Sequence, residues 1–166
     1  IQQHYKNFSS MSWVYSCGAG ANYGTALESA LKMGETIHIP SCCYEIEEYI
    51  HGPNLQLTPQ YNVIFFDGND GASRRVEQVY KATRKVSNRA YLISNNPQLS
   101  SDDHVLSLSD TVSSELCPLV YLPFVQLLSF IVSDDLHSIY QHPLLKEFKA
   151  IAAAKTENFV NYDGDD

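Results

Sequence analysis

Hydrophobic and polar positions change their spacing several times along the chain, as expected when strands alternate with helices. Short runs rich in β-branched and aromatic residues predict strands over 12–16, 36–40, 61–66, 90–94 and 104–108. Apolar residues at helical spacing predict helices over 23–33, 44–50, 72–87 and 116–132. Strands that alternate with helices favour right-handed crossovers, so we expect an α/β fold: a three-layer α/β/α sandwich around a mainly parallel, five-stranded sheet.

The pattern also suggests how the chain is divided. Residues 1–11 resemble the end of a preceding helix or a linker, 12–135 form one domain, and 136–166 form a C-terminal tail. Within the tail, 146–160 has some helical character, and the last residues are acidic. In a parallel sheet of this kind, ligands bind at the carboxyl ends of the strands, near the first strand-to-helix turn.

The composition of the chain limits the classes of partner that it is expected to bind. The chain has 166 residues and a formal net charge of −8, which argues against nucleic acid or an anionic membrane as the main partner but not against an anionic metabolite. No apolar run approaches the length of a membrane span, because Pro123, Gln126 and Ser129 interrupt the longest one. With no signal peptide before the fold we expect a cytoplasmic protein, and the initial Ile1 suggests a fragment or a missing start.

The four cysteines offer no recognisable metal-binding pattern. Cys42 and Cys43 are adjacent, which is poor geometry for a mutual disulfide, and none of the four forms a C-x-x-C pair. We expect reduced thiols, no metal and no organic cofactor.

A glycine-rich turn follows the first predicted strand and is the first candidate binding loop. Gly18, Gly20, Asn22, Tyr23 and Thr25 lie in or just after it, at the start of a helix whose free N–H groups suit an anion. A dinucleotide fingerprint fits poorly, because the third glycine comes one position late and no acidic residue ends the next predicted strand. A sugar-phosphate loop fits better, and a plain tight turn remains an alternative.

Three charged residues form a stripe along the following helix. Glu28, Lys32 and Glu35 are spaced i, i+4, i+7 and therefore share one face. Such a stripe is often only a solvated surface. Here it starts within two turns of the glycine loop, so we expect it to face the crevice at the strand ends, where a partly desolvated carboxylate beside a lysine could act as a general base.

His51 is the third candidate, at the end of a short helix and directly before Gly52 and Pro53. An imidazole held in this way can give or take a proton near neutral pH. The alternative is a helix-end histidine that only interacts with the terminal carbonyl groups.

Taken together, these motifs resemble a known family. The pattern A-L-E-x-A-L-K-x-x-E, from Ala26 to Glu35, followed by His51-Gly52-Pro53, is similar to the second SIS (sugar isomerase) domain of glucosamine-6-phosphate synthases and to fructosamine-6-phosphate deglycases and related phosphosugar isomerases. The resemblance covers residues 12–135 and implies a flavodoxin-like SIS fold. It implies a phosphosugar-binding domain of an aldose–ketose isomerase or deglycase, active as a homodimer or paired with another SIS domain.

The resemblance also implies roles for single residues. Glu35 would move a proton between C1 and C2 of the open-chain sugar, and His51 would assist ring opening in the neighbouring subunit's site. Glu28 and Lys32 would line the pocket and orient Glu35, and Lys155 is the best match for a lysine in the tail that closes the site.

The chain departs from the family in its phosphate-binding features. Asp67 and Asp70 stand where a hydroxyl-rich phosphate loop would follow the strand, so we expect the phosphate grip to come from a first SIS half. A non-catalytic, sugar-phosphate-sensing module of a regulator is the main alternative, but sensing has no use for the acidic stripe and the placed histidine.

Overall fold

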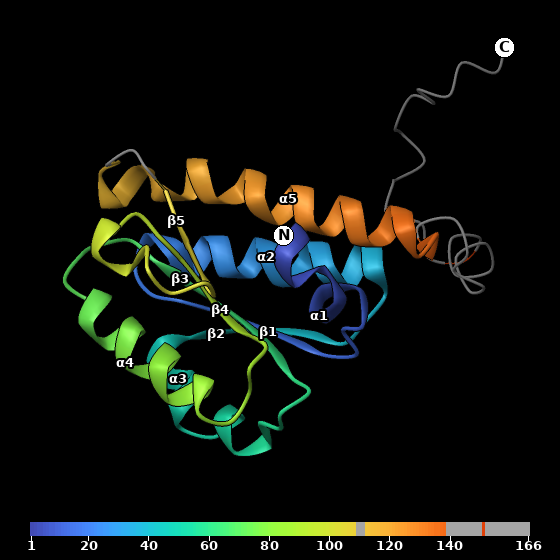
Figure 1. The fold of residues 1–166 in the computed structure, drawn as a ribbon, viewed down its shortest axis with the longest axis horizontal. Helices are drawn as coiled ribbons and strands as arrows, with labels where there is room; N and C mark the ends of the chain where they lie inside the picture. Colours follow the sequence, from blue (N-terminus) through green and yellow to red (C-terminus); the bar gives the residue numbers. More distant parts are fainter. Residues whose placement is uncertain (109–111, 139–150, 152–166) are drawn as a thin grey trace, which may run out of the picture.

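The fold is built on a five-stranded parallel sheet (Figure 1). The computed structural model describes residues 1–108, 112–138 and 151. The strands follow the order β2-β1-β3-β4-β5 across the sheet, and every neighbouring pair is parallel. They are β1 (Val14–Gly18), β2 (Ser41–Glu45), β3 (Asn62–Asp67), β4 (Ala90–Ser94) and β5 (Val105–Ser107).

Helices cover both faces of this sheet, which confirms the expected three-layer α/β/α sandwich. On one face lie α1 (Tyr5–Ser9), α2 (Ala21–Ile37) and α5 (Cys117–Asp135), and on the other lie α3 (Ile46–Ile50) and α4 (Ser73–Arg84). Short 3-10 turns complete the described elements: η1 (Gln2–His4), η2 (Pro53–Gln56), η3 (Pro97–Leu99) and η4 (Ser114–Leu116).

The two hydrophobic cores account for the apolar runs in the sequence. Successive side chains of β3 point to opposite faces, so Ile64 packs with α2 and α5 while Phe65 packs with α3 and α4. All residues of β1, β3 and β4 are buried. Central strands covered on both faces are therefore apolar at nearly every position rather than at alternate ones.

The predicted second strand is wrong. Residues 36 and 37 still belong to α2, which ends where His38 adopts a left-handed conformation with φ 63°, and β2 begins only at Ser41. The Thr36 hydroxyl donates to the carbonyl oxygen of Lys32 at 2.7 Å, one helical turn back. The helix predicted over 44–50 is correspondingly shorter, because Tyr44 and Glu45 belong to β2.

A capping box fixes the start of α3. The side chain of Glu45 accepts from the backbone N–H of Glu47 at 2.7 Å, while the Glu48 carboxylate accepts from the Glu45 N–H at 3.2 Å. Strand β2 therefore passes directly into α3 without a loop.

Helix α5 is more apolar and longer than the sequence analysis allowed. Together with η4 it spans Ser114–Asp135, 22 residues with a mean hydropathy of 1.9, enough by length and composition to cross a membrane. The expectation that no apolar segment reaches that length is thus wrong. Buried core helices pass the same test, and the inner face of α5 packs in the core with α2 through Tyr121, Val125 and Leu128.

The C-terminal tail lies largely outside the described residues. This applies to Lys155 and to almost all of the segment expected to have helical character, 146–160. The boundaries 1–11, 12–135 and 136–166, and the closing role of the tail, stay predictions.

Candidate functional site

The glycine turn joins the centre of the sheet to the start of α2. Gly18 ends β1, and a Cβ built on it would lie only 2.3 Å from the carbonyl oxygen of Asn22. Gly20 precedes α2 with φ 55°, a left-handed conformation that favours glycine. The amino end of α2 therefore lies at the carboxyl end of β1, where the sequence analysis places the binding loop, but the N–H groups of Asn22 and Tyr23 already donate to the carbonyl oxygens of Ala19 and Gly20.

Asn22 and Thr25 are buried inside this turn rather than displayed on it. Each is 1% exposed, and the Thr25 hydroxyl donates to Asn22 Oδ1 at 3.1 Å. The Asn22 amide nitrogen has no hydrogen-bond partner among the described residues, and it faces Gly68 in the loop after β3. The turn thus keeps one unpaired donor for a ligand oxygen or a water.

Tyr23 is half-buried near an acidic end of the sheet. Electrostatic interaction with Cys43, and then burial and the charges of Glu48 and Glu45, raise the pKa of Tyr23. The phenol therefore stays protonated at neutral pH and is available as a hydrogen-bond donor.

Asp67 organises the carboxyl end of β3 from inside. It is fully buried, and its carboxylate accepts hydrogen bonds from the hydroxyls of Ser73 and Ser94, the second at 2.6 Å, and from the Asn69 N–H at 3.0 Å. The Tyr121 hydroxyl of α5 donates to the Asp67 carbonyl oxygen at 2.7 Å. The charge of Asp67 is therefore held by protein donors, so this residue has a structural role at the site.

Asp70 is the acidic group that faces the glycine turn. One carboxylate oxygen caps the Ala72 N–H at 2.8 Å, and the other lies 3.6 Å from the position that a Cβ would take on Gly20. A carboxylate there disfavours phosphate at the start of α2. The expected departure from a hydroxyl-rich phosphate loop thus rests on Asp70 more than on Asp67.

The charged stripe on α2 has the geometry that its spacing predicts. Lys32 Nζ lies 2.8 Å from the Glu35 carboxylate and 3.5 Å from that of Glu28. The hydrogen bond with Glu35 is the main cause that raises the pKa of Lys32, so the ammonium stays charged. Glu35 is nevertheless only half-covered, with 49% of its side chain exposed.

The stripe does not lie where the sequence analysis places it. At ~1.5 Å per residue, Glu35 stands about 21 Å farther along α2 than Ala21, the first residue after the glycine turn. The expectation that this carboxylate faces the crevice at the strand ends is therefore wrong, because α2 runs antiparallel to the strands and carries Glu35 back toward the start of β2.

Glu35 instead lines a groove of about 610 Å³ beside the edge strand β2. Its other lining residues are mostly apolar: Leu27, Ala30, Leu31, Gly34, Ile39, Ser41 and Cys43. The groove is open to solvent along the outer side of α2, where Leu27 and Leu31 are about half exposed. Cover by a second domain would remove water from the Glu35 carboxylate, the condition under which it works best as a base.

His51 does not meet Glu35 within one chain. It ends α3, and its Nδ1 lies 2.7 Å from the carbonyl oxygen of Glu47, the helix-end arrangement considered as the alternative. Helix α3 covers one face of the sheet and α2 covers the other. A joint site requires His51 from another chain, so its catalytic role stays a prediction.

Comparison with known proteins shows which proteins this chain resembles. No family model matches the chain. It is 30% identical over 131 residues to the glutamine–fructose-6-phosphate aminotransferase (isomerizing) of Methanothermobacter thermautotrophicus, which covers 76% of this chain and 22% of the relative. In structure it matches the C-terminal domain of the glucosamine-fructose-6-phosphate aminotransferase from Francisella tularensis, with a TM-score of 0.67, 24% identity, and 80% of this chain and 38% of that one covered.

This chain resembles an SIS domain in sequence and in fold. It resembles the second SIS domain of glucosamine-6-phosphate synthase, as the stripe and His51 indicate. The tagatose-6-phosphate ketose/aldose isomerase from Escherichia coli shares the fold, with a TM-score of 0.68, 18% identity, and 78% of this chain and 38% of that one covered. The chain spans about a fifth of the length of the curated relatives that it matches.

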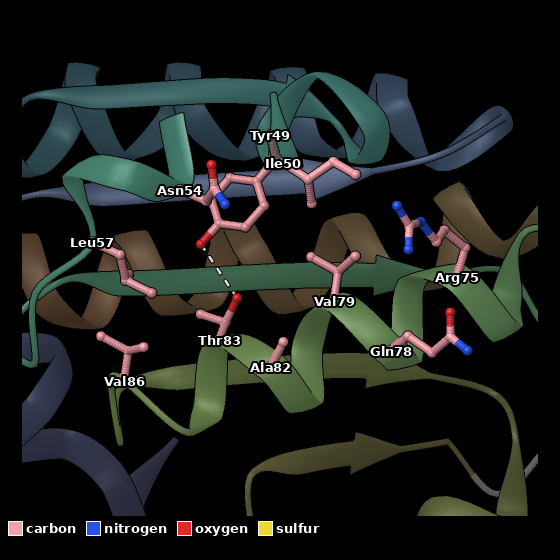
Figure 2. A pocket seen from close by; sticks show the side chains of 10 residues that line it. All are labelled: Tyr49, Ile50, Asn54, Leu57, Arg75, Gln78, Val79, Ala82, Thr83 and Val86. Atoms are coloured by element: carbon pink, nitrogen blue, oxygen red, sulfur yellow. Dashed lines mark hydrogen bonds between the residues drawn. The ribbon is translucent and has the colours of Figure 1, made fainter. Parts of the chain in front are cut away.

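A second cavity lies between α3, η2 and α4 (Figure 2). It has a volume of about 370 Å³, and Ile50, Leu57 and Val79 are among its apolar walls. The hydroxyls of Tyr49 and Thr83 are 3.3 Å apart beside it. The sequence analysis missed this cavity, because its walls come from two separate segments, 49–57 and 75–86, that only the fold brings together.

Proposed function

We propose that this SIS domain binds a phosphorylated sugar and supplies the proton-transfer residues of an isomerase or deglycase. The observation that carries the proposal is the Glu28–Lys32–Glu35 stripe, in which Glu35 lines the groove and its carboxylate lies 2.8 Å from Lys32 Nζ. Support comes from the relatives, whose names describe isomerising conversion of fructose 6-phosphate and ketose/aldose isomerisation of tagatose 6-phosphate.

In this mechanism Glu35 is the general base. It removes a proton from the carbon next to the carbonyl group of the open-chain sugar, which gives an enediol, and returns it to the neighbouring carbon, so that aldose and ketose interconvert without an external oxidant or reductant. Lys32 holds the carboxylate in place. In a deglycase, the same transfer moves a proton from C1 to C2 of a fructosamine 6-phosphate, and water then hydrolyses the resulting C1 imine to the free amine and glucose 6-phosphate.

A second SIS domain, from a partner chain or from the same polypeptide, completes the site. The outer surface of α2 and α5 is apolar, and Leu31, Leu119 and Phe130 are between 52% and 68% exposed. Apolar surface of this kind marks an interaction site. The partner would bring the phosphate grip, because Asp70 occupies that place here, and would cover the groove that Glu35 lines.

Thermal-shift measurements on the full-length protein test the proposal. Hexose, hexosamine and fructosamine 6-phosphates are compared with the same sugars without phosphate, and we expect at least one phosphorylated sugar to raise the Tm. A ligand at a hundred times its Kd stabilises by about 2.7 kcal/mol, which corresponds to a shift of a few degrees. If no phosphorylated sugar shifts the Tm more than its parent sugar, the proposal fails.

Proton exchange distinguishes the enzyme from the sensor. A stabilising sugar phosphate is incubated with the protein in heavy water, and deuterium at C1 or C2 is followed by NMR. Incorporation supports an isomerase or deglycase. Binding without incorporation or release of amine identifies the regulatory module instead.

We predict that variants at the two catalytic positions complement each other. His51→Ala and Glu35→Gln are each expected to be inactive, whereas mixing the two variant chains should restore about a quarter of the sites if His51 acts across a dimer interface. The readout is turnover after subunit exchange, with each variant mixed with itself as the control. Absence of recovery in verified mixed dimers argues against a shared site.

A further inference from the structure

Three potential metal ligands from distant parts of the chain meet at the amino end of the sheet. One ligand atom each from His4, Asp103 and His104 lies within 4.8 Å of the others. His4 belongs to η1, and His104 directly precedes β5. The cluster therefore lies away from the glycine turn, which stands at the carboxyl end of β1.

Hydrogen bonds prepare the His104 ring for coordination. Its Nε2 lies 2.9 Å from the carbonyl oxygen of Asn88, and because a carbonyl oxygen only accepts, Nε2 carries the hydrogen. Nδ1 lies 2.7 Å from the Asp103 carboxylate, which only accepts, so this contact needs a proton between the two atoms, and a metal ion would bind at Nδ1 in place of that proton. Metal-binding histidines characteristically donate their other ring N–H to a carbonyl or carboxylate in this way.

Ring packing holds the imidazoles of His4 and His104 next to each other. The Tyr91 ring stacks on His104 at a centroid distance of 5.1 Å, and the ring centroids of His4 and His104 are 4.4 Å apart. His4 Nε2 donates to the backbone carbonyl oxygen of Asp103 at 2.9 Å, so in the neutral form of this ring the lone pair is on Nδ1. The Asp103 side chain is 60% exposed and free to adjust.

We propose that His4, Asp103 and His104 form a site for a divalent transition-metal ion, with zinc as the ion that best fits two imidazoles and a carboxylate. Zinc binds nitrogen and oxygen ligands at about 2.0–2.2 Å, which places ligand atoms roughly 3.3 Å apart around the ion. Because the three ligand atoms already lie within 4.8 Å of one another, movements of up to about 1.5 Å would reach that spacing. Hard ions such as Mg²⁺ and Ca²⁺ prefer oxygen ligands and are not expected to bind.

The site would fasten the start of the chain to the sheet. Its ligands belong to η1 and to the loop before β5. The chain that links these two segments includes all of β1 to β4. An ion bound to both segments stabilises the folded state relative to the unfolded one, where the ligands are far apart. The function is thus structural and independent of the proposed sugar chemistry.

Zinc titration of the full-length protein by isothermal calorimetry, together with thermal shift, tests this site. We expect His4→Gln and Asp103→Ala each to weaken zinc binding at least tenfold and to reduce the zinc-induced rise in Tm. His38→Asn, a histidine change outside the cluster at a left-handed position that asparagine tolerates, should leave both unchanged. No zinc binding, or equal affinity in wild type and His4→Gln, overturns the proposal.

Cobalt separates this site from the free cysteines. Co²⁺ replaces zinc as a spectroscopic probe, and we expect weak visible d–d absorption that disappears in His4→Gln. The variant Asp103→Ala is a useful second test, because its exposed side chain is not part of the core. Strong near-ultraviolet charge-transfer absorption, typical of thiolate ligands, would locate the ion at cysteines and count against the site.

Discussion

Replacing Glu35 with glutamine is expected to reduce turnover by 10²–10⁴-fold, the usual contribution of a general acid or base. Glutamine keeps the size of the side chain and accepts a hydrogen bond from Lys32, but it cannot take a proton from carbon. The loss should appear in kcat more than in KM, because the change removes an interaction with the transition state. Deuterium exchange at C1 or C2 of the bound sugar phosphate measures the step directly.

Glu28→Gln is the matched control for this experiment. Glu28 is the other carboxylate of the stripe, 3.5 Å from Lys32 Nζ, and it is absent from the lining of the groove. We expect this variant to retain most of the activity. If both variants lose activity equally, the stripe acts through its charge alone, and if neither does, Glu35 is not the base.

Changing Gly18 to alanine is expected to destabilise the fold by about 3 kcal/mol or more. The new methyl group would lie 2.3 Å from the carbonyl oxygen and 2.8 Å from the carbonyl carbon of Asn22. Both are backbone atoms at the start of α2, so the helix itself must move. Urea unfolding monitored by far-ultraviolet circular dichroism measures the change in the free energy of unfolding.

The same substitution at Gly24 should have the opposite effect on the free energy of unfolding. Gly24 lies within α2, is exposed, and has no atom within 4 Å of the position of a Cβ. Alanine is favoured over glycine in helix interiors by about 0.5–1 kcal/mol, so Gly24→Ala should stabilise the protein by that order. Equal effects of the two substitutions would contradict the close approach of α2 to β1.

The central strands could be predicted because burial on both faces makes them distinctive. The run 90–94 has the bounds of β4, and 61–66 lies within one residue of β3. The first strand is displaced by two residues because Gly18, which the sequence assigns to a turn, still pairs with Phe66 of β3. The order of strands confirms the expected parallel architecture.

The edge strand could not be predicted from local pattern. Alternating isoleucines at 37 and 39 look like a strand, but α2 extends through Ile37, and Cys42, Cys43 and Tyr44 form β2 instead. Pairing with β1 decides which segment becomes the strand, and no short stretch of sequence contains that information. The error also concealed the groove, because Ile39 and Ser41 are part of its lining.

The candidate site was predicted in its spacing but not in its position. Helical periodicity places Glu28, Lys32 and Glu35 on one face, and the structure confirms it. Periodicity carries no information about how far along a helix the sheet edge extends. It therefore does not predict that Glu35 lies near the start of β2 rather than at the carboxyl ends of the strands. The cluster of His4, Asp103 and His104 could not be found by sequence analysis, because His4 is 99 positions from Asp103 in the sequence.

The half-exposed leucines on the outside of α2 and α5 bear on how the stability of the domain depends on its concentration in solution. If the proposed partner is a second copy that covers this surface, association stabilises the native state, and the native population then follows mass action. Dilution should then favour unfolding, and the melting temperature should climb as the protein is concentrated. Folding and assembly would then be coupled in a single equilibrium.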